Sequence, residues 1–194
     1  MLKLIVFIKI LIFLLLPFNI FSDDNENSII VDENTNILQN DNYEIYFNKN
    51  DQNIFLGNGT LLSISPNRKF VIWIFDENLK NIFNSNLSGL YLFDIDNLLK
   101  TKLTSEVYYG YGASWSPDGN FIVLDEGTGP GRTKKIFDTY NKNLVLEIET
   151  IGNFTWISNC DFIYNVYEEE IKTLLFPPSS IVYGNIHGEI KKIL

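Results

Sequence analysis

A glycine-rich segment near the middle of the chain has the residue types that bind phosphate groups. It runs from Glu126 to Arg132 with the sequence EGTGPGR, and Lys134 and Lys135 follow it. A Walker-type loop needs Gly-Lys-Ser/Thr where Arg132 stands, and a dinucleotide-binding loop must open a helix, whereas β-type residues follow here. We therefore interpret the segment as a loop between two strands, with Glu126 and Arg132 as candidates for a ligand or partner contact.

Side chains that perform catalysis are scarce or poorly placed. The chain has a single cysteine, Cys160, and a single histidine, His187, which excludes zinc, and nothing in the sequence brings the two together. Asp125 and Glu126 are adjacent on one expected strand, so their carboxylates should point to opposite faces. The acidic run 94–97 begins like a calcium loop but lacks its third oxygen ligand and its glycine. We predict no catalytic residue, no cofactor and no metal site.

Aromatic side chains are better candidates for binding. Tyr108, Tyr109, Tyr111 and Trp115 lie close together in the sequence. Aromatic rings can stack on sugars or on peptide side chains. The alternative for Trp115, and for Trp156 farther along the chain, is packing in the core.

Short strands must position all of these residues. From residue 43 onward, runs of β-branched and aromatic residues are separated by Asn, Asp, Gly or Pro about every 8–12 residues. No stretch has a convincing helical period. The chain is therefore predicted to be all-β and antiparallel.

An internal repeat organises the expected strands. SPNRKFVI at 65–72 recurs as SPDGNFIV at 116–123, and a fainter copy without proline covers 156–164. Proline, aspartate and glycine in this order favour a tight turn. Each copy has room for four strands in about 40–50 residues, which is the size of one propeller blade.

The stretch SWSPDGNFIV at 114–123 resembles the signature of TolB-like, PD-type (WD-like) β-propeller repeats, which occur in many exported bacterial proteins and in the propeller domains of some peptidases. The resemblance is good for 111–150, fair for 60–104 and weak for 153–194. It implies a propeller-like array of about three four-stranded antiparallel blades in these ranges. Strands between 28 and 57 could add a partial fourth blade.

The first residues are typical of an export signal. Lys3 precedes an apolar run that ends at Pro17, and Ser22 supplies a small residue before polar sequence, so we expect a signal peptide at 1–22. A polar flexible leader is expected at 23–42 and the propeller-like domain at 43–194. The predicted location is periplasmic or secreted, with an uncleaved membrane anchor as the alternative.

Net charge limits the choice of partner. The chain has a formal net charge of −9, which becomes −11 if Lys3 and Lys9 leave with the signal peptide. An acidic surface repels nucleic acid and anionic lipid headgroups, so we expect no nucleic-acid partner and no membrane association after cleavage. The expected partner is an envelope protein or a small ligand, and a homo-oligomer is a further alternative.

These observations favour an exported, non-enzymatic binding or scaffold protein of the cell envelope that uses propeller loops. The predicted contact residues are Tyr108, Tyr109, Tyr111, Trp115, Glu126 and Arg132. One alternative is a glycan-active or peptidase-associated propeller enzyme domain. Another is a degenerate propeller without activity.

Overall fold

A computed structural model describes residues 27–50, 52–75, 89–105, 113–126, 132–150, 153–167 and 179–193. Every regular element in these ranges is a β-strand. Over the same ranges, the chain forms no helix with the length and apolar character needed to cross a membrane. The expected signal peptide at 1–22 lies outside the described residues.

In the described ranges, sixteen strands form four separate sheets, and each sheet contains four strands that follow one another in the chain. We call these sheets blades 1 to 4. Blade 1 contains β1 (Asn27–Asp32), β2 (Thr35–Gln39), β3 (Glu44–Lys49) and β4 (Gln52–Asn58). Blade 2 contains β5 (Thr60–Ile64), β6 (Phe70–Phe75), β7 (Gly89–Asp94) and β8 (Leu99–Thr104). Blade 3 contains β9 (Ala113–Trp115), β10 (Phe121–Glu126), β11 (Arg132–Asp138) and β12 (Asn143–Thr150). Blade 4 contains β13 (Phe154–Trp156), β14 (Asp161–Tyr167), β15 (Ser179–Asn185) and β16 (Ile190–Lys192).

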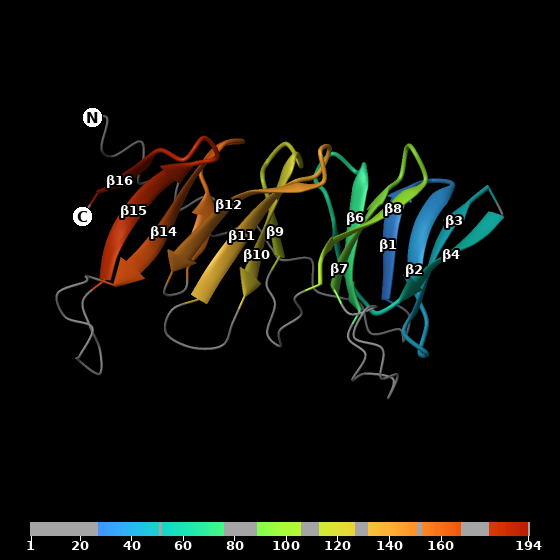
Figure 1. Ribbon diagram of the computed structural model, residues 1–194. Helices are drawn as coiled ribbons and strands as arrows, with labels where there is room; N and C mark the ends of the chain where they lie inside the picture. The colour runs from blue at the N-terminus through green and yellow to red at the C-terminus, as the bar shows by residue number, and fades with distance from the viewer. Residues whose placement is uncertain are drawn as a thin grey trace.

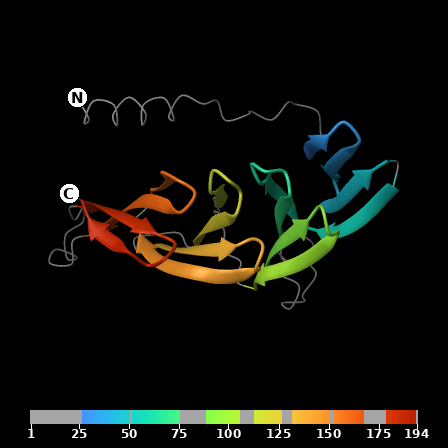
Figure 2. The same ribbon diagram turned by 90° about the horizontal axis from the view of Figure 1, so that it is seen from above.

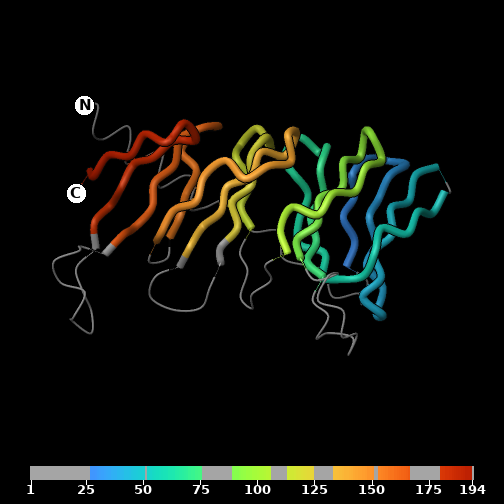
Figure 3. Tube along the Cα trace, viewed as in Figure 1, coloured from blue at the N-terminus to red at the C-terminus, as the bar shows by residue number. Residues whose placement is uncertain are grey.

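The four blades stand side by side in chain order (Figures 1 and 3). Seen from above, they form an open arc, with the first strand of each blade on the concave side and the last strand on the convex side (Figure 2). All strand pairs are antiparallel. The all-β, propeller-like array predicted from the sequence is confirmed.

Blade 1 is a complete blade, where the sequence predicted at most a partial one. Its first two strands occupy residues 27–39, so this part of the expected flexible leader (23–42) is instead a hairpin of the sheet. The physical reason is a period of two in which Ile29, Val31 and Ile37 all face blade 2, while the alternate positions hold Ser28, Ile30, Asn36 and Leu38. The chain therefore buries one side of a segment that is polar on average.

Apolar side chains gather in three clusters, one at each junction between neighbouring blades. Blade 2 is covered on both faces, and all six residues of β6 are buried. Alternate residues of this strand point to opposite sides, so Val71 and Trp73 pack toward blade 1 while Ile72 and Ile74 pack toward blade 3. The core of this protein is thus the set of contacts between blades.

A hydrogen bond from each later blade to the inner strand of the preceding blade accompanies this packing. Arg68 Nη1 donates to the carbonyl oxygen of Val31 at 2.7 Å. Trp115 Nε1 donates to Ser63 Oγ at 2.8 Å, and Trp156 Nε1 donates to the carbonyl oxygen of Ser114 at 3.3 Å. All three junctions therefore combine a directional polar contact with apolar burial.

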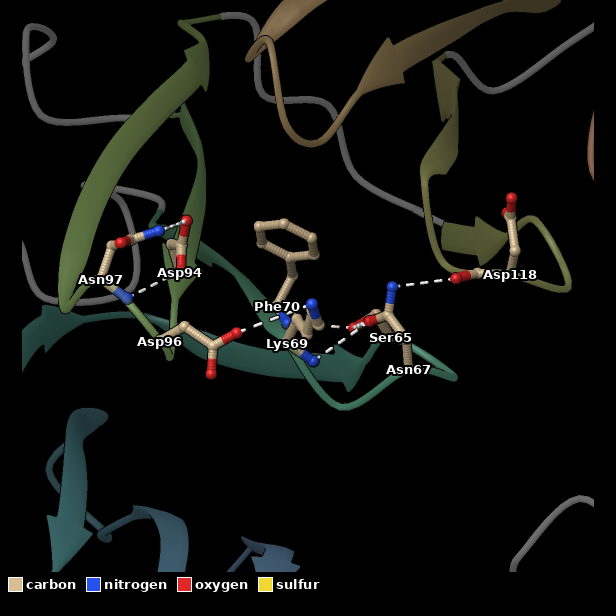
Figure 4. A network of polar contacts seen from close by, with 8 residues as sticks. All are labelled: Ser65, Asn67, Lys69, Phe70, Asp94, Asp96, Asn97 and Asp118. Carbon is tan, nitrogen blue, oxygen red and sulfur yellow. Dashed lines mark hydrogen bonds and ion pairs between the residues drawn. The ribbon is translucent and has the colours of Figure 1, made fainter.

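The repeated Ser-Pro turns link blades 2 and 3 (Figure 4). Ser116 Oγ donates to Asp118 Oδ1 at 2.7 Å and accepts from the Phe121 amide at 2.9 Å, which closes the turn. In the corresponding turn of blade 2, Asn67 Nδ2 reaches across to the carbonyl oxygen of Asp118 at 2.9 Å. Gly119 has a φ of 76°, so it adopts a left-handed conformation that favours glycine.

The Gly119→Ala substitution should destabilise the protein more than Gly188→Ala. Both glycines have positive φ, and an alanine in this conformation costs about 1–2 kcal/mol. A Cβ at Gly119 would also lie 2.8 Å from Asn67 Cγ, whereas nothing lies within 4 Å of a Cβ at Gly188. Urea unfolding of the two variants measures the difference, and equal losses would contradict a role of the Asn67 contact.

Candidate functional site

The connections between strands lie on two opposite sides of the array. Strands β10 and β14 end, and β11 and β15 begin, on the side that we call the loop side (Figure 1). The opposite side, the turn side, has the tight turns that follow the first and third strands of each blade, such as 116–120 and 139–142. A chemical site must therefore be sought separately on each side.

Two of the predicted contact residues, Glu126 and Arg132, lie at the loop-side edge of blade 3. Glu126 is the last residue of β10 and Arg132 the first residue of β11, and the two strands pair antiparallel up to Glu126 and Thr133. The backbone of both residues is described, but their side chains are not. Tyr108, Tyr109 and Tyr111 lie outside the described residues. The role of these five residues stays a prediction.

Trp115 lies in the junction between blades 2 and 3. It pairs with Ile122, packs against the apolar cluster of that junction and is half-buried. Its indole N–H is engaged by Ser63. Trp115 therefore packs between two blades, which is the alternative to a ligand contact. Trp156 takes the corresponding place in the junction of blades 3 and 4, where its side chain is 7% exposed.

A pocket that sequence reasoning missed lies between the outer parts of blades 1 and 2. Its volume is about 120 Å³. Its lining consists of Leu56, Gly57, Asn58, Trp73, Phe75, Tyr91 and Lys100. Asn58 is the last residue of β4 and Phe75 the last residue of β6, which places the pocket toward the loop side.

Strand register builds the wall of this pocket. Trp73 lies opposite Tyr91 in the β6–β7 pair, and Tyr91 lies opposite Lys102 in the β7–β8 pair, so the three side chains share one face. The rings of Trp73 and Tyr91 are stacked, with centroids 5.4 Å apart and planes 14° apart. The Nζ atoms of Lys100 and Lys102 lie 6.0 and 5.9 Å from the Tyr91 ring centroid, close enough for cation–π attraction.

Polar groups in the pocket include the ammonium of Lys100, the phenol of Tyr91 and the amide of Asn58. Lys100 Nζ donates to the carbonyl oxygen of Leu56 at 2.8 Å, which ties the outer strand of blade 2 to blade 1. Burial raises the pKa of Tyr91, so its hydroxyl stays protonated at neutral pH. The pocket therefore offers aromatic surface and positive charge, which suits a planar ligand group with a carbonyl or carboxylate.

Carboxylates and serines on the turn side are engaged in turns. Asp94 accepts from the backbone and side chain of Asn97, and Asp138 accepts in the same way from Asn141. The run 94–97, which resembles the start of a calcium loop, is thus a turn (Figure 4). Over the described ranges, no group of three or more His, Cys, Asp or Glu side chains is placed to hold a metal ion.

Cys160 and His187 lie on neighbouring turns, a proximity that the sequence did not indicate. The Ile186 amide donates to the carbonyl oxygen of Cys160 at 2.9 Å, which joins the two turns. Burial, and then the negative charges of Asp118 and Asp161, raise the pKa of the Cys160 thiol. A nucleophilic cysteine needs the opposite shift. These surroundings oppose an active thiolate.

No family model and no curated protein matches this chain. Solved structures do match. The β-propeller domain of the trilobed protease from Pyrococcus furiosus aligns with a TM-score of 0.56 at 19% identity, covering 82% of this chain and 53% of that one. The acylaminoacyl peptidase of Pyrococcus horikoshii aligns with a TM-score of 0.53 at 14% identity, covering 90% and 31%. A eukaryotic initiation factor aligns with a TM-score of 0.54 at 13% identity, covering 89% and 44%.

The fold is that of a β-propeller. At these identities the similarity establishes the fold alone, so the PD-type repeat family stays a prediction. The chain spans about half of the protease propeller domain and about a third of the peptidase. The four blades of this propeller therefore correspond to part of the neighbours' chains.

Replacing Trp115 by phenylalanine should destabilise the propeller by about 1–2 kcal/mol, because the hydrogen bond to Ser63 and part of the indole packing are lost. Ser63→Ala combined with Trp115→Phe should cost less than the sum of the single changes, since both remove the same contact. Chemical unfolding of the four proteins measures this coupling. A Trp115→Phe variant with unchanged stability would contradict the packing role.

Alkylation of Cys160 by iodoacetamide should require a higher pH than alkylation of a free cysteine. The thiol pKa is raised, so the thiolate fraction at a given pH is smaller than in an unstructured peptide. The rate is measured as a function of pH for the folded protein, with the urea-unfolded protein as the control. A folded midpoint below that of the control would indicate a thiolate stabilised by His187.

Proposed function

We propose that this propeller is an exported, non-enzymatic binding or scaffold protein of the cell envelope that contacts a protein or a small ligand on its loop side. The observation that carries the proposal is that the turn side and the loop side of the array have different kinds of side chain. On the turn side, the carboxylates and serines close turns, as Asp118 and Ser116 do. Toward the loop side, aromatic and cationic side chains line a pocket. A hollow on the turn side of blade 1 is lined by polar residues only, namely Asp32, Glu33, Asn34, Thr35, Lys49 and Asn50.

The proposed contact has two parts. One is the Trp73–Tyr91–Lys100 pocket at the junction of blades 1 and 2, which suits a planar group with a carbonyl or carboxylate. The other is the loop-side edge of blade 3, where Glu126 and Arg132 bound the connection between β10 and β11. Tyr108, Tyr109 and Tyr111 lie outside the described residues, and their part in this contact rests on the sequence alone.

An envelope location is part of the proposal. It rests on the export signal expected at 1–22.

In a protein whose net charge is −9, the two lysines beside Tyr91 are a local concentration of positive charge. An acidic or carbonyl-rich partner would be drawn to this place rather than to the rest of the surface.

The main alternative is a propeller that accompanies a peptidase. It is favoured by the fold similarity to the propeller domain of the trilobed protease, at the level of fold alone. A glycan-active propeller and a degenerate propeller without activity are further alternatives. Turnover of a peptide or glycoside panel by the purified protein distinguishes the enzymes from a binding protein.

Loop-side substitutions should weaken capture of a partner from envelope extract at least about tenfold, equivalent to ~1.4 kcal/mol. The variants are Lys100→Ala, which removes the pocket ammonium, and Tyr109→Ala with Arg132→Ala. Lys49→Ala is the control, because Lys49 ends β3 on the turn side. Quantitative pull-down gives the affinity. The free energy of unfolding should change by less than about 1 kcal/mol for the Tyr109/Arg132 variant and for Lys49→Ala. Lys100→Ala should cost about 1.5–3 kcal/mol, because it also loses the hydrogen bond to the Leu56 carbonyl.

An equal loss of partner capture by the Lys49→Ala control would show that capture is non-specific and would contradict a loop-side contact. Absence of any captured partner, together with turnover of a peptide or a glycoside, would overturn the binding proposal in favour of an enzyme. If no partner is captured and no peptide or glycoside is turned over, the degenerate propeller is favoured.

A further inference from the structure

Among the residues that the structure describes, no blade packs on the outward face of blade 1. In β1 to β3, the residues that alternate with the buried ones point away from blade 2. Ile30, Leu38, Tyr46 and Phe55 are the apolar members of this face, which we call the head face. Ile30 is 72% exposed and Phe55 is 51% exposed, and the Phe55 ring lies 5.4 Å from the ring of Tyr46.

The outward face of blade 4 is a second sheet face on which none of the described blades packs. Phe162, Tyr164 and Val182 pack toward blade 3, so the alternate residues point away from it. Ile163, Ile181, Tyr183 and Ile193 are the apolar members of this face, which we call the tail face. Ile193 is 53% exposed, and the other three are half-buried by their neighbours in the sheet.

Head and tail faces correspond to the two kinds of face that meet at every junction inside the chain. At each of the three junctions, the tail-type face of one blade packs on the head-type face of the next. The later blade also donates a hydrogen bond to the inner strand of the earlier blade, at Val31, Ser63 and Ser114. On the inner strand of blade 4, Thr155 stands one residue before Trp156, as Ser114 stands before Trp115, and it is exposed.

Within the described part of the chain, both end blades have the same four strands as the inner blades. Blades 1 and 4 each contain four consecutive strands, so the ring cannot be closed by a strand that one end lends to the other. To close the ring, another blade must pack its whole face on each of the two end faces. The propeller domain that this chain matches is about twice as long as the aligned part, since the chain covers 53% of it.

We propose that two copies of this chain join tail to head and close into one ring of eight blades. A second copy supplies the two surfaces that the ends lack, because its head face covers the first copy's tail face and its tail face covers the first copy's head face. Both contacts repeat the packing already present at the three internal junctions. A head-to-tail contact of this kind closes into a ring when the rotation fits. The inference is independent of the proposed ligand.

Size-exclusion chromatography with light scattering tests the proposal directly. The wild-type protein should have twice the mass of one chain. Phe55→Glu on the head face and Ile193→Glu on the tail face should each raise the dissociation constant at least about tenfold, because each places a charge in both contacts. Leu99→Glu is the matched control, since Leu99 is 49% exposed on the outer strand of blade 2 and lies on neither end face.

A mixture of the two end-face variants provides the decisive measurement. Phe55→Glu chains retain an intact tail face, and Ile193→Glu chains retain an intact head face, so mixing should produce mixed dimers through one unaltered contact. Circular dichroism melts establish that each variant is folded. The proposal is overturned if the wild-type protein is a monomer or an open polymer at ~100 µM, well above typical specific affinities. It is also overturned if only one end-face variant dissociates the dimer or if Leu99→Glu dissociates it equally.

Discussion

Every part of this structure depends on one constraint, which is that a four-stranded sheet with two apolar faces must be covered on both. Blade 2 has no polar face to present to water, because all six residues of β6 are buried. It is stable only between two neighbours, and the same holds for blade 3, whose strands contribute to two apolar clusters. Apolar burial of about 25 cal/mol per Å² therefore acts between blades and not within them. The blades therefore pack face to face in a row, and the row forms the arc.

Packing between flat faces does not by itself fix how far one blade slides along the next. Directional contacts supply this register. The indole N–H groups of Trp115 and Trp156 and the guanidinium of Arg68 each reach the inner strand of the preceding blade. The bond from Asn67 to the Asp118 carbonyl locks two successive turns on the turn side. Serine, aspartate and tryptophan, which elsewhere perform catalysis or bind ligands, here hold the blades in register.

Much of the fold could be predicted because the Ser-Pro turn repeats at a fixed place in the blade. The repeat locates 65–72 and 116–123, and the chain between them has room for three further strands. Blade 1 has no such turn, since Glu33 and Asn34 join β1 to β2. Its short apolar run at residues 29–31 did not distinguish a strand from the expected polar leader. A tight turn without proline gives a weaker local signal than SPDG does.

The pocket could not be predicted, for a different reason. Trp73 belongs to the continuous apolar run FVIWIF, which indicates a buried strand and nothing more. Its stacking on Tyr91 and the approach of Lys100 depend on the register of β6, β7 and β8, including the irregularity at Leu90 and Tyr91. For Trp115, by contrast, the sequence indicated two roles, contact with a ligand and packing in the core. The hydrogen bond from its indole N–H distinguishes them, and the acceptor of that bond, Ser63, lies in another blade.

The pocket is a consequence of the same blade-to-blade constraint. The outer strands of the blades lie on the convex side of the arc (Figure 2), and the pocket lies between the outer parts of blades 1 and 2. Lys100 bridges it by its bond to Leu56, while Gly57 leaves it open. A Cβ on Gly57 would stand 3.7 Å from Trp73 Nε1, and its φ of 149° disfavours any other residue. The packing that stabilises the propeller and the opening offered to a ligand therefore meet at the junction of blades 1 and 2, where glycine and lysine replace the aliphatic contacts found nearer the axis of the arc.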